Sequence, residues 1–295
     1  MAGHSDWRMR GRPHDNEAME RRLALIGFGE AARAFAGQLS ASLRGYDLKS
    51  DADMLDAFAA DGLIACDTPR DALEGADGAL SLVTADQALP AARATEGLAP
   101  GALWFDMNSI APDTKRTAAE AIAARGGRYV DVAVMAPVHP KRTSVPLLLA
   151  SSHAEAGAEY LRAIGFRDVA IVGDRVGAAS AIKMIRSVMI KGIEGLSAEC
   201  VLAAETAGVR EAVIASLDAS WPGADWARRF DYNLDRMMLH GGRRAAEMDE
   251  VVATLDALGT GSAMSRGTAE RQRAIGALGI APPDGLDAKL KALAA

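Results

Sequence analysis

The sequence predicts an α/β fold in which a doubly wound, mostly parallel sheet is followed by an all-helical part. Strand and helix patterns alternate from Leu23 to about Gly173, and strand patterns stop after Asp174. A glycine-rich turn also follows the first apolar run. With 295 residues, the chain is long enough for two domains. We expect a flexible tail over residues 1–21, a sheet domain over residues 22–173 and a helical domain over residues 174–295.

Eight short apolar runs have the length and composition of strands. They are Leu23–Ile26, Leu43–Asp47, Leu63–Cys66, Gly78–Val83, Ala102–Asp106, Tyr129–Met135, Leu147–Ser151 and Val169–Val172. Between them, Asp53–Ala60 and Thr114–Ala124 show the apolar spacing of amphipathic helices. Sheets of this kind bind ligands at the carboxyl ends of their strands, beside the reversal of strand order.

The second part begins with a long helical pattern rich in alanine and methionine, from Val176 to Ala207. Helical patterns continue nearly to the end of the chain. We expect four breaks in them, because glycine and proline interrupt helices. The breaks are predicted at Trp221–Gly223, Gly241–Gly242, Gly259–Gly261 and Ala281–Pro283.

Composition excludes several classes of protein. The formal net charge of −6 argues against a general nucleic-acid-binding protein. Cys66 and Cys200 lack metal-type spacing, so neither a disulfide scaffold nor a metal site is expected. No apolar run approaches the ~20 residues of a membrane span, and residues 1–21 lack the apolar core of a secretory signal. We therefore expect a cytoplasmic enzyme with a small-molecule substrate.

The turn after the first strand has the pattern G-x-G-x-x-A. Gly27 permits a tight exit from the strand, Gly29 leaves room for a pyrophosphate, and Ala32 lets the helix pack close to the sheet. The amide groups at the start of that helix attract phosphate. The pattern predicts a Rossmann-type dinucleotide site. Its cofactor-binding residues are expected to be Gly27, Phe28, Gly29, Glu30, Ala31 and Ala32.

Asp47 ends the second predicted strand, 20 positions after Gly27. An acidic residue near this position accepts hydrogen bonds from the ribose 2′-OH of NAD and repels the 2′-phosphate of NADP. The position therefore favours NAD. Arg44 and Lys49 lie close enough in sequence to hold a phosphate, so NADP stays open.

A second signal lies at the start of the long helix. Small residues from Gly177 to Ala181 allow close approach to another element or to a ligand, and Lys183 follows among apolar residues. A desolvated lysine has a lowered pKa, which suits proton transfer. Ser187 and Lys191 continue the same helix face. The alternative is a lysine whose ammonium group reaches out to solvent.

Together these motifs resemble those of the β-hydroxyacid dehydrogenase superfamily, which includes 6-phosphogluconate dehydrogenase and 3-hydroxyisobutyrate dehydrogenase. Besides the glycine turn and Lys183, the resemblance rests on Asp106–Pro112, similar to the family pattern D-x-S-T/S-x-x-P, and on Tyr129–Val134, similar to its D-A-P-V strand. The run His240–Met248 is typical of the branch described as 6-phosphogluconate-dehydrogenase-like NAD-binding oxidoreductases.

The resemblance implies hydride transfer between a substrate hydroxyl and NAD or NADP, with Lys183 as general acid/base. Ser187 stands where the family usually has an asparagine that orients substrate and lysine. The resemblance also implies a homodimer built by the helical domains. Residues expected to border the cofactor are Leu82, Val83, Thr84 and Asn108, and Ser109 is expected to contact the substrate.

The chain departs from the family at the substrate loop. The usual S-G-G is replaced by Met135, Ala136 and Pro137, and proline has no N–H to donate to a carboxylate. We therefore expect a bulkier, less polar substrate. His240, Arg243 and Lys191 are further candidate substrate contacts, since a guanidinium group suits an anion. The alternative for Arg243 is a solvated helix position paired with nearby acids.

Two other functions fit the same sequence. Imine reductases have a similar two-domain plan but often replace the lysine, so Lys183 favours alcohol chemistry. A non-catalytic protein that binds a dinucleotide is the other alternative, because the substrate loop is altered.

Overall fold

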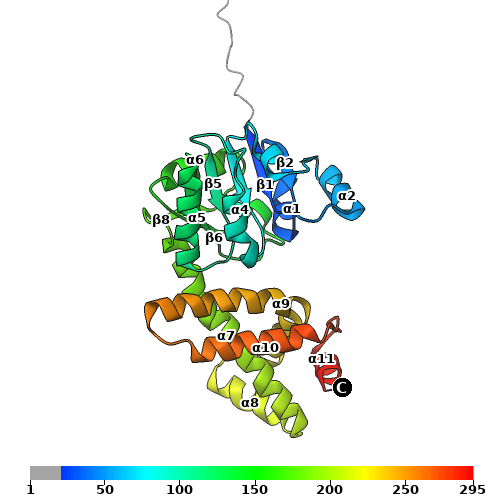
Figure 1. The fold of residues 1–295 in the computed structure, drawn as a ribbon. Coiled ribbons are helices and arrows are strands. Elements are labelled where there is room, and N and C mark those ends of the chain that lie inside the picture. Colours follow the sequence, from blue (N-terminus) through cyan, green and yellow to red (C-terminus); the bar gives the residue numbers. More distant parts are fainter. Residues whose placement is uncertain (1–20, 295) are drawn as a thin grey trace, which may run out of the picture.

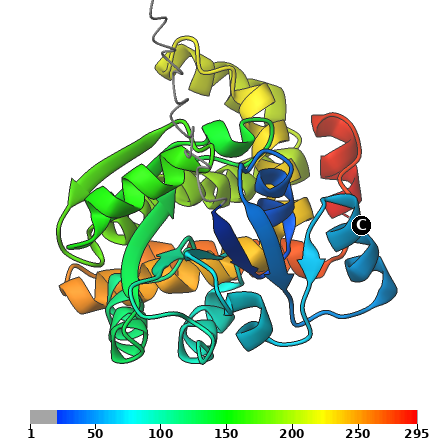
Figure 2. The same cartoon turned by 90° about the horizontal axis from the view of Figure 1, so that it is seen from above.

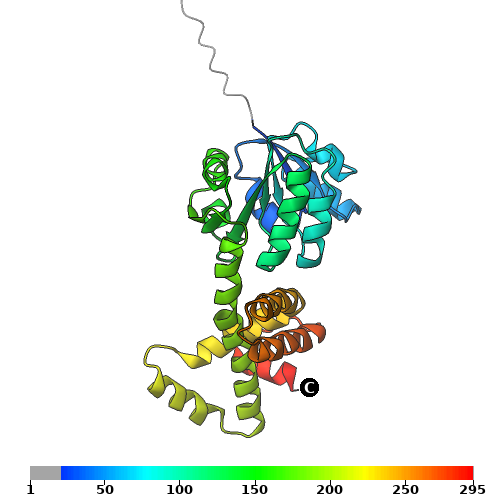
Figure 3. The ribbon, with the colours of Figure 1, turned by 60° about the vertical axis from the view of Figure 1, so that its left-hand side comes forward.

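A computed structural model describes residues 21–294. Figures 1 and 3 show an α/β part and a helical part that are joined by one long helix, α7, Ala178–Thr206. Apart from Arg21, the tail predicted for residues 1–21 lies outside the described residues. The α/β part followed by a helical part confirms the predicted fold class.

The sheet has eight strands in the order β3-β2-β1-β4-β5-β6-β7-β8. They are β1 Arg22–Ile26, β2 Ser42–Tyr46, β3 Ile64–Ala65, β4 Gly78–Ser81, β5 Leu103–Asp106, β6 Arg128–Val134, β7 Leu147–Ala150 and β8 Val169–Gly173. Each overlaps a predicted strand. Neighbouring strands are parallel except β6 and β7, which are antiparallel. Strand order reverses between β1 and β4, which is where sheets of this kind bind ligands.

Helices cover both faces of the sheet (Figure 2). They are α1 Glu30–Ala36, α2 Ala52–Ala60, α3 Pro69–Leu73, α4 Ala88–Arg93, α5 Pro112–Ala124 and α6 Ala154–Ala163, with 3-10 turns η1 Ala85–Gln87 and η2 Arg142–Ser144. One face of the sheet packs around phenylalanines, among them Phe28, which stacks on Phe58 with ring centroids 4.2 Å apart. The other face packs around Trp104.

The helical part contains α7 and four further helices. These are α8 Arg210–Ser220, α9 Trp226–Leu258, α10 Ala263–Ala277 and α11 Leu286–Leu293. Helices α7, α9 and α10 pack against one another, and α9 also approaches the α/β part (Figure 1). Across residues 21–294, none of the helices combines the length and apolarity that spanning a membrane requires.

The predicted break at Gly241–Gly242 is wrong, because α9 runs unbroken through both glycines. Gly241 is buried, and a Cβ atom added there would lie 2.7 Å from the Cα of Gly276 on α10. The glycine therefore lets two helix backbones approach closely. Packing against α10 stabilises the helix more than the glycines weaken it.

The adjacent glycines give a matched test. We expect Gly241→Ala to destabilise the protein by about 1–3 kcal/mol, because the new methyl group overpacks the contact with α10. Gly242→Ala is the control, since a Cβ there meets nothing within 4 Å, and it is expected to be neutral or to stabilise by up to about 1 kcal/mol. Urea unfolding measures both. Equal stabilities for the two variants would contradict this account of the packing.

Candidate active site

The glycine turn lies between β1 and α1, at the carboxyl edge of the sheet. Gly27 has φ +91°, and a Cβ there would lie 2.6 Å from the carbonyl oxygen of Leu82, so the turn requires glycine. A Cβ at Gly29 would meet nothing within 4 Å. This open space beside the start of α1 fits a dinucleotide phosphate. Of the predicted residues, Gly27 to Gly29 form the turn and Glu30 to Ala32 begin α1, with Ala32 buried.

Asp47 lies directly after β2 and holds this turn. Its carboxylate accepts hydrogen bonds from the amides of Phe28 at 2.7 Å and Lys49 at 2.9 Å. Phe28 is fully buried in the core and its amide is bonded to Asp47, so this residue supports the turn from within the protein. Asp47 therefore stands beside the glycine turn, as its position in the sequence predicts.

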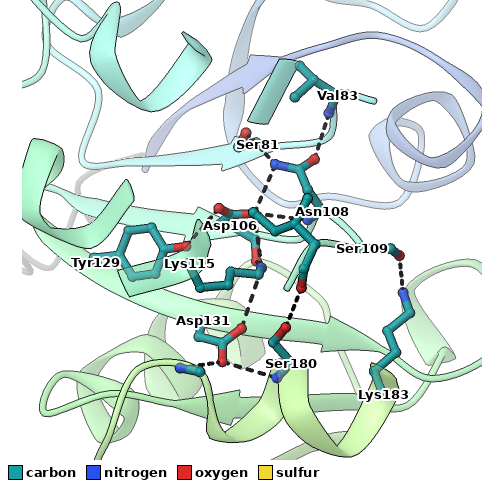
Figure 4. Close-up of polar contacts among 12 residues, drawn as sticks. Ser81, Val83, Asp106, Asn108, Ser109, Lys115, Tyr129, Asp131, Ser180 and Lys183 are labelled. Atoms are coloured by element: carbon teal, nitrogen blue, oxygen red, sulfur yellow. Dashed lines mark hydrogen bonds and ion pairs between the residues drawn. The ribbon is translucent and has the colours of Figure 1, made fainter. Parts of the chain in front are cut away.

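The next strand ends carry a network of polar contacts (Figure 4). The side-chain oxygen of Asn108 accepts from the amide of Val83 at 2.8 Å. Its Nδ2 donates to Ser81 Oγ at 2.9 Å and to Asp106 Oδ1 at 2.8 Å. Asn108 is buried and thus holds the loop after β4, where Leu82 and Val83 are half-buried and Thr84 is exposed. Asn108 therefore supports the loop after β4 from the protein interior.

Lys183 reaches this edge from the first turns of α7. Its Nζ lies 2.5 Å from Ser109 Oγ, across the boundary between the α/β part and the helical part (Figure 4). Burial lowers the pKa of Lys183 to about 8, against an opposing effect of the Glu247 carboxylate. The side chain therefore loses its proton far more readily than an ordinary lysine does.

The rest of this face of α7 is engaged within the protein. Ser187 is buried and donates to the carbonyl oxygen of Lys183 at 2.9 Å. Lys191 is also buried, and its Nζ lies 2.5 Å from Glu247 Oε2. Burial alone would raise the pKa of Glu247, but the ammonium groups of Lys191 and Lys183 lower it to about 2. Lys191 thus has an anionic partner of its own, which the sequence did not reveal.

The predicted substrate loop follows β6. The amide of Met135 donates to the carbonyl oxygen of Pro146 at 2.9 Å, so it is not free for a ligand. Ala136 is half-buried and Pro137 is exposed. Together with the missing N–H of proline, this leaves the loop poor in donors for a carboxylate.

Arg243 links the two parts of the molecule. Its Nη1 donates to Glu30 Oε2, the first residue of α1, at 2.9 Å. Burial alone would raise the pKa of Glu30, but Arg243 lowers it below its ordinary value. His240 lies nearby, half-buried, and its pKa is lowered by burial and by Arg236 and Arg243. The acid paired with Arg243 is therefore Glu30 of α1, and not an acidic residue of its own helix α9.

Several residues around the site were not among the site residues predicted from the sequence. Lys115 and Asp131 lie buried beneath it, Glu247 faces Lys191 and Lys183, and Glu250 Oε2 accepts from the amide of Ala111 at 2.6 Å. One signal for Lys115 was present. It shares the buried face of α5 with Ala118 and Ile122, at helical spacing, where an apolar residue is expected.

Two family models match the chain. One, described as the NAD binding domain of 6-phosphogluconate dehydrogenase, covers residues 22–165. The other, described as a domain of unknown function (DUF1932), covers residues 204–275. The solved structure of a conserved hypothetical protein from Sinorhizobium meliloti 1021 has 38% identity, with a TM-score of 0.73 over 94% of this chain and 97% of that one. The chain belongs to the β-hydroxyacid dehydrogenase superfamily.

Solved structures with lower sequence identity share the fold. The 3-hydroxyisobutyrate dehydrogenase of Mycobacterium tuberculosis, solved with L-serine, has 15% identity and a TM-score of 0.72, covering 94% of this chain and 100% of its own. A variant of the imine reductase from Myxococcus stipitatus, solved with NAD+, has 18% identity and a TM-score of 0.60 over the same shares of the two chains. No curated protein matches the sequence. As a superfamily member, the chain has an NAD-binding, hydroxyacid-dehydrogenase-like fold.

The pairing of Arg243 with Glu30 generates a prediction about cofactor affinity. Without Arg243, the Glu30 carboxylate would stand unneutralised beside the turn that is predicted to hold the cofactor phosphates. We expect Arg243→Met to weaken NADH binding by about fivefold, in keeping with a half-exposed ion pair worth at most ~1 kcal/mol. Fluorescence titration with NADH measures the Kd.

Two further variants sharpen this experiment. Arg273→Met removes a similarly exposed arginine, paired with Asp249 of α9, and should leave the Kd unchanged. Glu30→Gln combined with Arg243→Met should restore affinity, because the unneutralised carboxylate is gone. Native-like NADH binding by the single Arg243→Met variant would contradict the interpretation.

Proposed function

We propose that this protein is an NAD(P)-dependent oxidoreductase that transfers hydride between a hydroxyl group, or the matching carbonyl, and nicotinamide. The observation that carries this proposal is the contact of 2.5 Å between Lys183 Nζ and Ser109 Oγ. It brings a lysine with a pKa of about 8 to the carboxyl edge of the sheet that holds the glycine turn. Superfamily membership supports the same reaction class.

The fit of a dinucleotide rests on the geometry of the turn. Gly27 and Gly29 would let the pyrophosphate approach the backbone at the start of α1, since Gly29 leaves open space there. Asp47 would accept hydrogen bonds from a ribose hydroxyl, which favours NAD over NADP. Leu82, Val83 and Thr84 would border the nicotinamide. When bound, the nicotinamide supplies the hydride acceptor or donor.

The protein's own contribution is the control of one proton. For oxidation, the neutral amine of Lys183 would accept the hydroxyl proton of the substrate. For reduction, its ammonium form would donate that proton to the carbonyl oxygen. A pKa near 8 allows both forms close to neutral pH, which is the condition for efficient general acid/base catalysis. Ser109 would orient the lysine through the hydrogen bond that joins them.

The substrate proposed is bulkier and less polar than a simple 3-hydroxy acid. The amide of Met135 is bonded to the carbonyl oxygen of Pro146, and Pro137 has no N–H, so the loop offers few donors to a carboxylate. Lys191, Arg243 and His240 are candidate contacts for a polar group. Lys191 and Arg243 would first have to share or exchange their partners, Glu247 and Glu30. A screen of hydroxy acids and aryl-substituted alcohols, read by the absorbance of reduced nicotinamide, identifies the substrate.

Imine reduction is the second candidate, because imine reductases are among the proteins that share the fold. Lys183 favours alcohol chemistry over it. A non-catalytic protein would bind NAD(H) without turnover across the whole panel. Including cyclic imines in the screen therefore separates the three functions.

The pH profile tests the role of Lys183. With a substrate from the screen, kcat/KM for oxidation should rise with pH and level off above about 8, because the amine must be neutral to accept a proton. For reduction, kcat/KM should fall above about 8, because the ammonium form is the donor. Steady-state kinetics between pH 6 and 10 in both directions, at roughly half-unit steps, measures the profile.

The matching variant is Lys183→Ala. It should lower turnover by about 10²–10⁴-fold and remove the inflection near pH 8, while NADH affinity stays close to native. Lys141→Ala is the control, since Lys141 is exposed on the loop before β7. Full turnover by Lys183→Ala on a true substrate would refute the proposed role.

We further propose a homodimer that buries the exposed face of α7. Five large apolar side chains of α7 are between 42% and 64% exposed. They are Ile182, Ile185, Met189, Ile190 and Leu196. Exposed apolar patches of this kind mark interaction sites, and the position next to Lys183 would let a second copy help close the active site.

Light scattering at micromolar concentration tests this assembly. We expect about twice the 30.8 kDa chain mass for the native protein and a shift toward monomer for Met189→Glu, because a buried unpaired carboxylate disfavours association. Met264→Glu is the control, since Met264 is exposed on α10 outside this face. A native protein that stays monomeric would overturn the proposal.

A further inference from the structure

Three fully buried charged groups lie beneath the candidate site. Lys115 of α5, Asp106 at the end of β5 and Asp131 of β6 are each 0% exposed. Lys115 Nζ lies 3.0 Å from Asp106 Oδ1 and 3.4 Å from Asp131 Oδ1, and it donates to the carbonyl oxygen of Asp106 at 2.6 Å. Burying such groups costs free energy unless each charge is compensated. Their arrangement therefore calls for an explanation beyond core packing.

Asp106 connects the cluster to the loop beside the glycine turn (Figure 4). It accepts from Tyr129 Oη at 2.7 Å and from the amide of Asn108 at 3.0 Å. Burial and the Asp106 carboxylate raise the pKa of Tyr129 well above its ordinary value, so the phenol stays a donor. Asn108 in turn holds the amide of Val83. Both carboxylate oxygens of Asp106 are thus hydrogen-bonded, and Asn108 links this carboxylate to the loop after β4.

Asp131 connects the cluster to α7. Its Oδ2 accepts from the amide of Gly177, the N-cap residue of α7, at 3.0 Å and from the amide of Ser180 in the first turn at 3.1 Å. Ser180 also donates through its hydroxyl to the carbonyl oxygen of Ile110. Lys183 follows Ser180 by one helical turn. The carboxylate of Asp131 therefore fixes the start of the helix that carries Lys183.

The other oxygen of Asp131 depends on Lys115. Asp131 Oδ1 is buried and has no hydrogen-bond partner within residues 21–294. In that same part of the chain, Lys115 is the only cation that forms an ion pair with Asp131. Removing one partner of a buried pair leaves an uncompensated charge, which is strongly unfavourable. Lys115 is therefore the side chain that compensates the buried Oδ1 of Asp131, the residue that caps α7.

We propose that Lys115 is a positioning residue: by balancing Asp131 and Asp106, it holds the start of α7 and thus places Lys183 against Ser109. This inference rests on the proposed function only for the catalytic role of Lys183. The placement itself concerns the chain alone and can be measured without cofactor or substrate.

The test compares three variants of the full chain. Lys115→Met removes the buried cation. Lys289→Met is the matched control, because Lys289 is another buried lysine, 3% exposed, paired with Asp231 and Asp235 far along the helical part. Lys115→Met combined with Asp131→Asn is the rescue variant, since a neutral amide still accepts from Gly177 and Ser180 but needs no counter-charge.

The first readout is hydrogen exchange of the Gly177 and Ser180 amides, followed by NMR. In Lys115→Met we expect these two amides to exchange at least about tenfold faster relative to amides of the central sheet, the factor that a local loss of ~1.4 kcal/mol gives. Lys289→Met should leave that ratio unchanged. The rescue variant should return it to near the native value.

The second readout is the titration of Lys183, followed through its 13Cε signal and assigned by its loss in Lys183→Ala. The chain has seven lysines, so the spectrum is simple. The native midpoint is expected near pH 8. It should rise in Lys115→Met as the helix start loosens and a nearby cation is lost. It should return toward 8 in the rescue variant and stay at 8 in Lys289→Met.

Unchanged exchange at Gly177 and Ser180 in Lys115→Met would overturn the proposal, as would exchange that rises equally across the sheet. If Lys115→Met does not fold, the rescue variant decides: protected amides support the proposal, and unprotected amides overturn it. Failure of the proposed function is a separate result. In that case Lys183→Ala keeps its turnover whatever the exchange experiment gives.

Discussion

The site depends on the hydrogen bonds between the carboxylate of Asp131 and two amides at the start of α7, those of Gly177 and Ser180. These bonds join the sheet to the helix that carries Lys183, and they set where that helix begins. From there Lys183 reaches Ser109 in the loop between β5 and α5. The carboxylate comes from the middle of a buried strand that is paired with a neighbouring strand on each side.

Helix α9 supports the same arrangement from the other side. Glu250 accepts from the amide of Ala111 at the start of α5, and Arg243 pairs with Glu30 at the start of α1. Glu247 compensates the buried charge of Lys191. It also raises the pKa of Lys183, which burial lowers. The helical part therefore contributes charges to the strand ends and influences the proton affinity of Lys183.

Local patterns in the sequence were sufficient for much of this organisation. The alternation of strands and helices, the glycine turn and Asp47 were all predicted, because each depends on residues close together in the chain or on a motif with fixed spacing. Lys183 could be singled out because a lysine among apolar residues at the start of a helix is uncommon. A buried lysine on the apolar face of α5 was an equally local signal, and Lys115 could have been recognised from it.

Other features depended on which elements become neighbours. Gly241 predicted a break in the helix, yet it lies inside α9 and allows this helix to touch α10. The sequence cannot separate these two roles, because a glycine looks the same in both. Arg243 and Lys191 suggested free cations for a substrate, yet their partners Glu30 and Glu247 come from distant segments. The sequence by itself determined the fold class, the dinucleotide turn and the lysine. Only the tertiary structure decided the partner of each charge, because pairing energies act through space between segments far apart in the chain.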